Sequence, residues 1–160
     1  MGQTTYAGFW LRFVAVIIDN LIIDVLQFFL IIPLLASFGL TFFTLDVGEF
    51  NSLSEEDLVV MIPALISLIS SVALLSFLVK LLYYALMESS KSQATLGKMA
   101  LGIIVTDTNG ERLDFTKAMI RQLFKLLSGM IMMIGYLMAG FTEKKQALHD
   151  IIANTYVVKK

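Results

Sequence analysis

The first apolar segment of the sequence contains five polar side chains that recur at helical spacing. An α-helix turns about 100° per residue, so these side chains fall within a wedge of roughly 140° on one helical face. At a rise of about 1.5 Å per residue, the wedge extends about 22 Å along the helix axis. Its members are Arg12, Asp19, Asn20, Asp24 and Gln27. The spacing predicts a membrane helix with a single polar stripe.

Carboxylates inside a membrane segment are unfavourable unless something shelters them. An ionised aspartate at the centre of a membrane helix costs about 2.5–3.5 kcal/mol on insertion-based scales. The wedge is therefore expected to face protein or a water-filled cavity. Intramembrane acids of this kind typically mark ion, proton or substrate paths, which favours Asp19 as an ion- or proton-binding carboxylate. The structural alternative is that the polar stripe only joins helices through hydrogen bonds.

Charged side chains far along the chain are candidate partners for this wedge. Arg121 and Lys125 stand four residues apart and therefore share one face of a helix. His149 and Asp150 follow near the end of the sequence. We expect Asp150 to meet Arg12 or Arg121 at the cytoplasmic end of the first helix.

Catalysis and metal binding are not indicated by the residue types. The sequence has one histidine and no cysteine, so it contains no thiolate nucleophile, disulfide or cysteine–metal site. His149 and Asp150 are adjacent, and adjacent helical residues point about 100° apart, so they do not form an oriented catalytic pair. We expect neither an enzyme nor a bound cofactor or metal.

The composition is that of a membrane protein. Of the 160 residues, 58% are hydrophobic, against about 45–50% in a soluble domain. This length corresponds to one membrane domain, residues 1–160. The net charge of -1 indicates no nucleic-acid partner. The first apolar run is too long for a cleavable signal peptide, so we expect it to remain as a membrane helix.

Three apolar segments are expected to contact membrane lipid. The first runs from Phe9 to Ile32 and stops near Pro33, and the second runs from Leu58 to Met87. Both are long enough to span the ~30 Å hydrocarbon core of a bilayer. Ser54 precedes an acidic triplet and is expected to cap the second helix. The third segment, residues 126–142, is at the lower length limit for a span.

The distribution of lysine and arginine sets the expected orientation in the cell (inner) membrane. The 39–57 loop has five acidic residues and no basic one, whereas residues 88–117 contain four lysines and arginines. The positive-inside rule places the 39–57 loop outside and the 88–117 loop in the cytoplasm. The N-terminus is then cytoplasmic too.

The basic tail conflicts with three complete crossings. Four lysines in residues 144–160 favour the cytoplasm, whereas a full third span would place them outside. Residues 102–106 and 155–158 have the composition of strands, and Asn109-Gly110 is a type I′ turn signal that would return residues 111–115 as another strand. If 155–158 pairs with 102–106, both must lie on one side of the membrane. A third segment that bends back or rests in the interface is therefore favoured over three full spans.

The predicted fold is accordingly an all-α integral membrane protein. It has two long transmembrane helices and a third membrane segment that is broken or re-entrant. A small cytoplasmic β element is expected near residues 102–115 and 155–158.

Three separated blocks of the sequence occur in a recognisable order. They read YAGFWLRFVAVIIDNLIID at 6–24, TLGKMALGIIVTDTNGERLDF at 95–115 and KKQALHDIIANTYVV at 144–158. With these blocks the chain resembles the RDD family of small prokaryotic membrane proteins, which is named for one arginine and two aspartates. These fall on Arg12, Asp19 and Asp150. Asn154 stands where many members have a glycine. The resemblance implies transport of an unidentified ligand, with sodium/proton exchange in some members.

The leading interpretation is a small membrane transporter, or a subunit of one, that handles Na⁺ or H⁺. Asp19 would bind the ion or proton, and Arg12 would be its electrostatic partner or would form a gate with Asp150. The polar path would be extended by Asn20, Asp24 and Gln27. Two or three helices can hardly enclose a route alone, so a homo-oligomer or another membrane protein is required. The alternative is a non-transporting scaffold or regulatory module in which Arg12, Asp19 and Asp150 form a structural polar lock.

Overall fold

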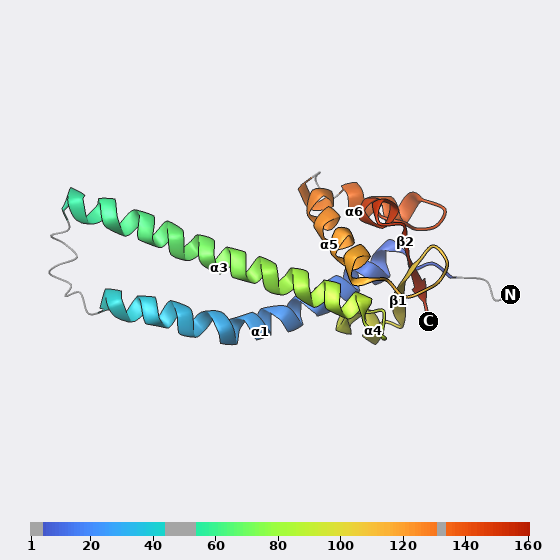
Figure 1. Cartoon of the computed structure of the whole chain (residues 1–160), viewed down its shortest axis with the longest axis horizontal. Helices are drawn as coiled ribbons and strands as arrows, with labels where there is room; N and C mark the ends of the chain where they lie inside the picture. Colours follow the sequence, from blue (N-terminus) through green and yellow to red (C-terminus); the bar gives the residue numbers. More distant parts are fainter. Residues whose placement is uncertain (1–4, 44–53, 131–133) are drawn as a thin grey trace. The chain divides into compact units, whose positions relative to one another are not determined.

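The chain divides into two compact units, which are described separately. The computed structural model describes residues 5–43, 54–130 and 134–160. The two-helix unit comprises Ile23–Leu78, and the sheet unit comprises Met1–Ile22 together with Val79–Lys160. Two long helices, α1 and α3, contribute residues to both units (Figure 1).

Helices α1 (Phe9–Phe43) and α3 (Glu55–Ser89) are the two long helices predicted from the apolar segments. Within the described residues, the stretches Phe9–Pro33 and Glu55–Ser89 are long and apolar enough to cross a membrane. The apolar segment predicted to stop near Pro33 matches the stretch Phe9–Pro33, but the helix itself runs further. A proline removes one backbone donor and crowds the preceding turn, but the apolar residues that follow continue the helix to Phe43.

The start of α3 carries the predicted cap. The Asp57 amide donates a hydrogen bond to Ser54 Oγ at 3.2 Å, and the Ser54 amide donates to Asp57 Oδ2 at 2.8 Å. This reciprocal arrangement satisfies backbone donors that have no partner inside the helix. The acidic side chains of the first turn also lie at the positively polarised end of α3.

The two-helix unit exposes apolar side chains along both of its helices. Val59, Ile69 and Leu74 are each more than half exposed. Gln27 is buried and donates a hydrogen bond to the backbone oxygen of Ser76 at 3.1 Å. Soluble proteins rarely expose large continuous apolar surfaces, so this unit is suited to a bilayer.

The sheet unit is built around two antiparallel strands. Strands β1 (Ile103–Asp107) and β2 (Thr155–Lys159) pair with Val105 opposite Val157. The predicted pairing of residues 102–106 with 155–158 is confirmed. The start of the chain joins this sheet, because Tyr6 forms a bridge to Val158 and the Ala7 amide donates to the Val157 carbonyl oxygen at 2.8 Å.

Residues 111–115 do not form the second strand predicted after the Asn109-Gly110 turn. A turn is present, but it is not the predicted type I′ turn, because Gly110 has a φ of 84° whereas Asn109 does not have a positive φ. The Asp107 amide donates one backbone hydrogen bond across the turn, to the Glu111 carbonyl oxygen at 2.9 Å. The Glu111 amide donates to the side chain of Asp107 at 2.9 Å, so it does not make the return bond of a hairpin ladder. The chain then enters a helix at Phe115.

The third apolar segment is divided between two helices, α5 (Phe115–Met130) and α6 (Ile134–Phe141), and residues 131–133 lie outside the described part of the chain. The two helices contact each other: the Tyr136 hydroxyl donates to the Lys125 carbonyl oxygen at 3.2 Å. Short helices α4 (Leu96–Ala100) and α7 (Leu148–Ile152) precede β1 and β2, respectively. Figure 1 shows α4–α6 and the strands gathered around the start of α1 and the end of α3.

The apolar core of the sheet unit is small. It consists of side chains from β1 and β2, from α5, from the connection between β1 and α5, from the beginning of α1 and the segment before it, and from the last turns of α3. Its fully buried members are Ala7, Ala15, Ala85, Ile103, Val105, Leu113, Ala118 and Val157. Charged and polar groups fill the space beside it.

Candidate functional site

Asp19 of α1 is completely buried in the sheet unit, with 0% exposure, and it accepts three hydrogen bonds. Its Oδ1 accepts from the Gly97 amide at 2.7 Å and from the Tyr83 hydroxyl at 2.9 Å. Its Oδ2 accepts from Thr95 Oγ1 at 2.6 Å. Hydrogen bonds to an ionised acceptor are roughly twice as strong as neutral ones, so this set of donors stabilises the carboxylate.

The contact between Asp19 and Gly97 fixes the beginning of α4. Thr95 precedes α4, but its side chain makes no capping hydrogen bond to the helix. Instead, Asp19 of α1 accepts a hydrogen bond from the first turn of α4. Gly97 has to be a glycine here, because a Cβ atom would overlap the carbonyl oxygen of Ala15 and would lie 3.0 Å from Asp19 Oδ1. Asp19 therefore attaches α4 directly to α1.

A second group of charged side chains forms a buried network centred on Glu88, at the end of α3. Glu88 Oε1 accepts from Lys98 Nζ at 2.5 Å. Its Oε2 accepts from Arg121 Nη1 at 2.5 Å and from Gln122 Nε2 at 2.8 Å. Glu88 is fully buried, and Lys98 and Arg121 are each less than 5% exposed. One carboxylate thereby joins α3, α4 and α5.

Asp150 of α7 connects this network to Arg12 of α1. Asp150 Oδ1 accepts from Arg121 Nε at 2.8 Å, and its Oδ2 forms an ion pair with Arg12 Nη1. Arg12 also donates to the carbonyl oxygens of Ala7 at 2.9 Å and Lys145 at 2.6 Å. Arg12 thus binds the segment around α7 to the beginning of the first helix.

Lys125 is the most weakly paired cation of the network. Its Nζ lies 3.7 Å from Glu88 Oε1 and 4.5 Å from the centre of the Tyr84 ring. The network contains two carboxylates, Glu88 and Asp150, and four cationic side chains, Arg12, Lys98, Arg121 and Lys125. With every member ionised, positive charges exceed negative ones by two.

Burial affects the titration of the groups outside the long helices in different ways. Burial by itself would raise the pKa of Asp150, but the charges of Arg121 and Arg12 outweigh it and hold this pKa below its usual value. Burial lowers the pKa of Lys125 to about 7, although the charge of Glu88 opposes the change. Burial also lowers the pKa of His149 well below its usual value. Asp150 is therefore ionised near neutral pH, whereas Lys125 titrates there.

Comparison with known proteins identifies the family of the chain. Residues 6–154 match the RDD family. The chain belongs to the RDD family. It is 37% identical over 154 residues to the "Uncharacterized protein YxaI" of Bacillus subtilis (strain 168), covering 96% of this chain and 97% of that protein.

A second relative is the "Uncharacterized membrane protein YteJ" of the same organism, which is 30% identical over 154 residues, or 96% of this chain and 80% of that protein. No solved structure matches the chain at a significant level. Together with the two long apolar helices, membership of the RDD family makes this a membrane protein.

The RDD arginine and aspartates occupy two neighbouring arrangements in the sheet unit. Arg12 and Asp150 form an ion pair within the buried network, whereas Asp19 binds Tyr83, Thr95 and Gly97. Arg12 pairs with Asp150 rather than with Asp19. The predicted charge partners Arg121 and Lys125 both face Glu88.

The rest of the predicted polar stripe is distributed differently. Asn20 is half-buried in the sheet unit. Asp24, which is exposed, and Gln27 both belong to the two-helix unit. Gln27 binds a backbone oxygen of α3 there. The five residues of the stripe are therefore distributed over both units.

His149 lies between Ser128 and Asp150 but is not arranged as a catalytic base. Its Nδ1 is 3.5 Å from Ser128 Oγ and its Nε2 is 3.5 Å from Asp150 Oδ1. Ser128 Oγ donates instead to the Phe124 carbonyl oxygen at 3.0 Å. All three side chains are buried. In the described part of the chain, no group of three His, Cys, Asp or Glu side chains is placed to hold a metal ion.

The sequence prediction missed the residues that organise both arrangements. From the sequence, Glu88 is only the boundary of the 88–117 loop, and Tyr83 has no predicted role in the site. The sequence does contain a signal for Glu88, because it is an isolated acidic residue at the end of a long apolar segment, and Arg121 and Lys125 form a basic pair that could neutralise it. No local signal marks Thr95 or Gly97 as partners of Asp19, because they lie more than 70 residues away in sequence.

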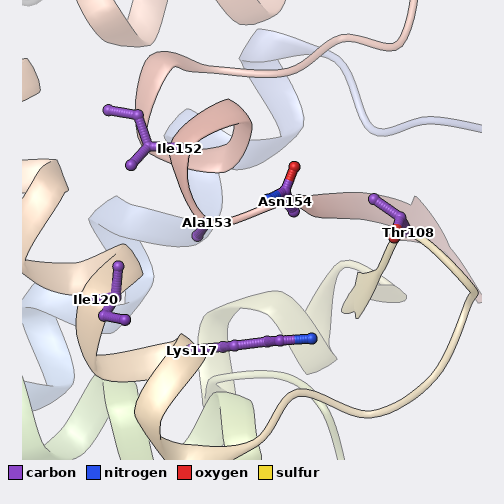
Figure 2. A pocket seen from close by; sticks show the side chains of 6 residues that line it. All are labelled: Thr108, Lys117, Ile120, Ile152, Ala153 and Asn154. Carbon is purple, nitrogen blue, oxygen red and sulfur yellow. The ribbon is translucent and has the colours of Figure 1, made fainter.

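A surface pocket of about 390 Å³ lies apart from the network. Figure 2 shows the Lys117 side chain reaching into it, with Ile120 on the same helix and Ile152 of α7. None of its lining residues belongs to the network or binds Asp19. The pocket is lined by Thr108, Lys117, Ile120, Ile152, Ala153 and Asn154.

Proposed function

We propose that this RDD protein is a non-transporting membrane module whose buried polar groups hold the start of the first helix within the sheet unit. The observation that supports the proposal is the environment of Asp19. Its two oxygens already accept three hydrogen bonds, and no part of it is exposed. A carboxylate that holds the start of a helix in this way is occupied by structural contacts and is not available to a passing ion.

The ion-pair network extends the same role to the rest of the unit. Through Glu88, Asp150 and the four cations it joins α1, α3, α4, α5 and α7. Removing one partner from a buried pair leaves an uncompensated charge and destabilises a protein by about 3–5 kcal/mol. Such a module holds a fixed surface at the membrane, as a scaffold or a regulatory subunit of another membrane protein would.

We place the N-terminus and the sheet in the cytoplasm and the 39–57 loop outside, in agreement with the positive-inside rule. The pairing of β1 with β2 supports a third segment that returns to the side from which it starts. The chain has no cysteine, so single-cysteine variants label one site each. A membrane-impermeant maleimide applied to intact cells should label Asn51→Cys, and should label Lys160→Cys only after permeabilisation. Labelling of both from the same side would contradict this topology.

A second candidate function is ion or proton transport, and the observation that favours it is Lys125. Its pKa is lowered by burial to about 7, so the network can gain or lose a proton near neutral pH. Asn20, Asp24 and Gln27 would then extend a polar path for H⁺ or Na⁺. Because two long helices do not enclose a route, this function requires a second copy of the chain or another membrane protein.

One substitution distinguishes the two functions. Asp19→Asn preserves the size of the side chain and removes its charge. We expect Asp19→Asn to be purified in detergent with near-normal folded yield and to leave Na⁺ and H⁺ flux in vesicles at the level of the unmodified protein. Normal yield with flux lost relative to the unmodified protein would favour transport over the lock. Glu111→Gln, at an exposed position outside the polar stripe and outside both buried arrangements, is the control.

A further inference from the structure

Helix α5 has the reverse polarity of a helix on the surface of a water-soluble protein. From Ile120 onward its polar side chains face inward: Arg121 is 2%, Gln122 5% and Ser128 0% exposed. Its apolar side chains Leu123 and Leu126 face outward and are 45% and 44% exposed. A helix in water normally places these faces the other way round. The medium around α5 therefore has to be apolar.

The same polarity continues onto α6 and reaches the start of the first helix. Leu137 and Phe141 of α6 are 45% and 90% exposed. Gly140, beside Phe141, lies against α1, since a Cβ atom at Gly140 would be 4.0 Å from the Cβ of Phe9. Phe9 is the first residue of a stretch long enough to cross the membrane, and Trp10 next to it is 74% exposed. The exposed residues of α6 thus adjoin the point where α1 begins its span.

The other edge of α5 carries a lysine beside apolar side chains. Ile120 and Ile152 line the surface pocket, and the Lys117 side chain extends into it from the turn before Ile120 (Figure 2). The Lys117 Nζ lies 4.0 Å from Asp107 Oδ2, so its ammonium group stays at the polar edge of the surface while its stem lies beside the isoleucines. This arrangement is typical of a helix that lies at a membrane interface.

We propose that the outward surface of α5 and α6 is inserted among the acyl chains of the cytoplasmic leaflet. We call this surface the leaflet face, and it comprises Ile120, Leu123, Leu126, Leu137 and Phe141. The sheet unit is then held partly within the membrane by a surface that does not cross it. The proposal rests on the cytoplasmic placement of the sheet given above, and it adds the partner of this surface, which is lipid.

Continuity with α1 is the reason for choosing lipid over a second protein. The apolar face of α1 from Phe9 onward meets acyl chains if that helix spans, and α6 adjoins its first turn. A leaflet face at that level enters the same medium without any further partner. The inward charges of α5 are meanwhile paired with Glu88 and Asp150, so insertion exposes no unpaired charge of α5 to hydrocarbon.

Depth-dependent fluorescence quenching tests the leaflet face directly. Trp10 is the single tryptophan, so Trp10→Phe provides a background without tryptophan. Leu123→Trp in this background reports on the leaflet face, and Leu126→Trp repeats the measurement one turn further along α5. Arg112→Trp, in the exposed connection before α5, is the water-exposed control, and Leu74→Trp on α3 is the lipid-exposed reference. Each full-length variant is reconstituted in phosphatidylcholine–phosphatidylglycerol vesicles that contain brominated lipids.

We expect brominated acyl chains to quench Leu123→Trp and Leu126→Trp nearly as strongly as Leu74→Trp, and aqueous iodide to quench only Arg112→Trp. Iodide quenching of both α5 variants would overturn the proposal in favour of a water-exposed face. Weak quenching of both by lipid and by iodide would overturn it in favour of a covering protein or second copy. The cysteine-labelling experiment tests the topology independently. It therefore distinguishes a wrong placement of the sheet from a correct placement in which the leaflet face is covered by protein or exposed to water.

Discussion

Substitutions at Asp19 test whether its hydrogen bonds, rather than its charge, hold the sheet unit together. Asp19→Ala leaves three donors without their acceptor: the buried Gly97 amide, the buried Thr95 hydroxyl and the partly buried Tyr83 hydroxyl. Each unsatisfied buried donor costs about 1–3 kcal/mol, so the two buried donors cost about 2–6 kcal/mol. This is a large part of the roughly 5–15 kcal/mol that stabilises a typical domain. We expect Asp19→Ala to give little folded protein.

Asp19→Asn should be much milder. The amide oxygen can take the place of Oδ1 and keep the Gly97 and Tyr83 bonds. The amide nitrogen then faces Thr95 Oγ1, which can rotate its proton away and accept. The remaining loss is the charge assistance of these bonds, about 1 kcal/mol for each. Asp19→Asn should therefore be the milder change, because it keeps all three hydrogen bonds and leaves no buried donor unsatisfied.

The double variant Asp19→Asn with Thr95→Val is the decisive comparison, because it removes the acceptor of the asparagine amide. Thermal unfolding in detergent, followed by circular dichroism, measures all three variants and Thr95→Val alone. We expect the double variant to lose less stability than the sum of the two single changes, because both changes act on the same Thr95–Asp19 hydrogen bond. If Asp19→Asn unfolds as readily as Asp19→Ala, the charge is the stabilising feature and this reasoning is refuted.

Three further predictions follow from the same contacts. Gly97→Ala should strongly reduce the folded yield, because its Cβ would overlap the Ala15 carbonyl oxygen. Gly102→Ala should be milder, because a Cβ there meets open space and only the φ of 63° is unfavourable. Size-exclusion chromatography compares the folded yield of the two variants. Glu88→Gln should lower the free energy of unfolding by about 3–5 kcal/mol, because it leaves buried cations unpaired. Chemical denaturation measures this loss, with Glu111→Gln at an exposed position as the control. A loss of stability in Glu88→Gln no larger than that in Glu111→Gln would contradict the prediction.

Lys125 should make stability depend on pH, because its pKa is about 7 in the folded protein against an ordinary value of 10.5. Between these values the unfolded chain binds more protons, so the free energy of unfolding should rise with pH by up to about 1.4 kcal/mol per unit. Unfolding measured from pH 7 upward should show this slope in the unmodified protein and a smaller slope in Lys125→Met; equal slopes would refute it.

The long helices and the sheet pairing could be predicted from local properties. Apolar length alone defines α1 and α3, and Ser54 with Asp57 marks where α3 begins. The strands β1 and β2 follow from short runs of β-branched residues, and the lysines of the tail indicate that the two belong on one side. These features depend on neighbours in sequence or on total composition, which is why a single sequence reveals them.

The candidate site could be predicted only in part. Helical spacing shows that Arg12 and Asp19 share a face, but it does not identify what that face contacts. Asp19 meets the first turn of α4, and a five-residue helix has too little periodicity to be recognised in advance. Glu88 is similar, since its role depends on side chains that α4 and α5 bring to it. Long-range contacts of this kind are fixed by the packing of the whole unit.

The place of β2 near the end of the sequence determines when the sheet unit can be completed during synthesis. Residues 155–159 pair with β1 and also hold the segment before α1, through the Tyr6–Val158 bridge and the Ala7–Val157 hydrogen bond. They leave the ribosome after every other described element. During synthesis, Arg12 therefore lacks Asp150 until nearly the whole described chain has been made. The sheet unit can close only after β2 has been translated.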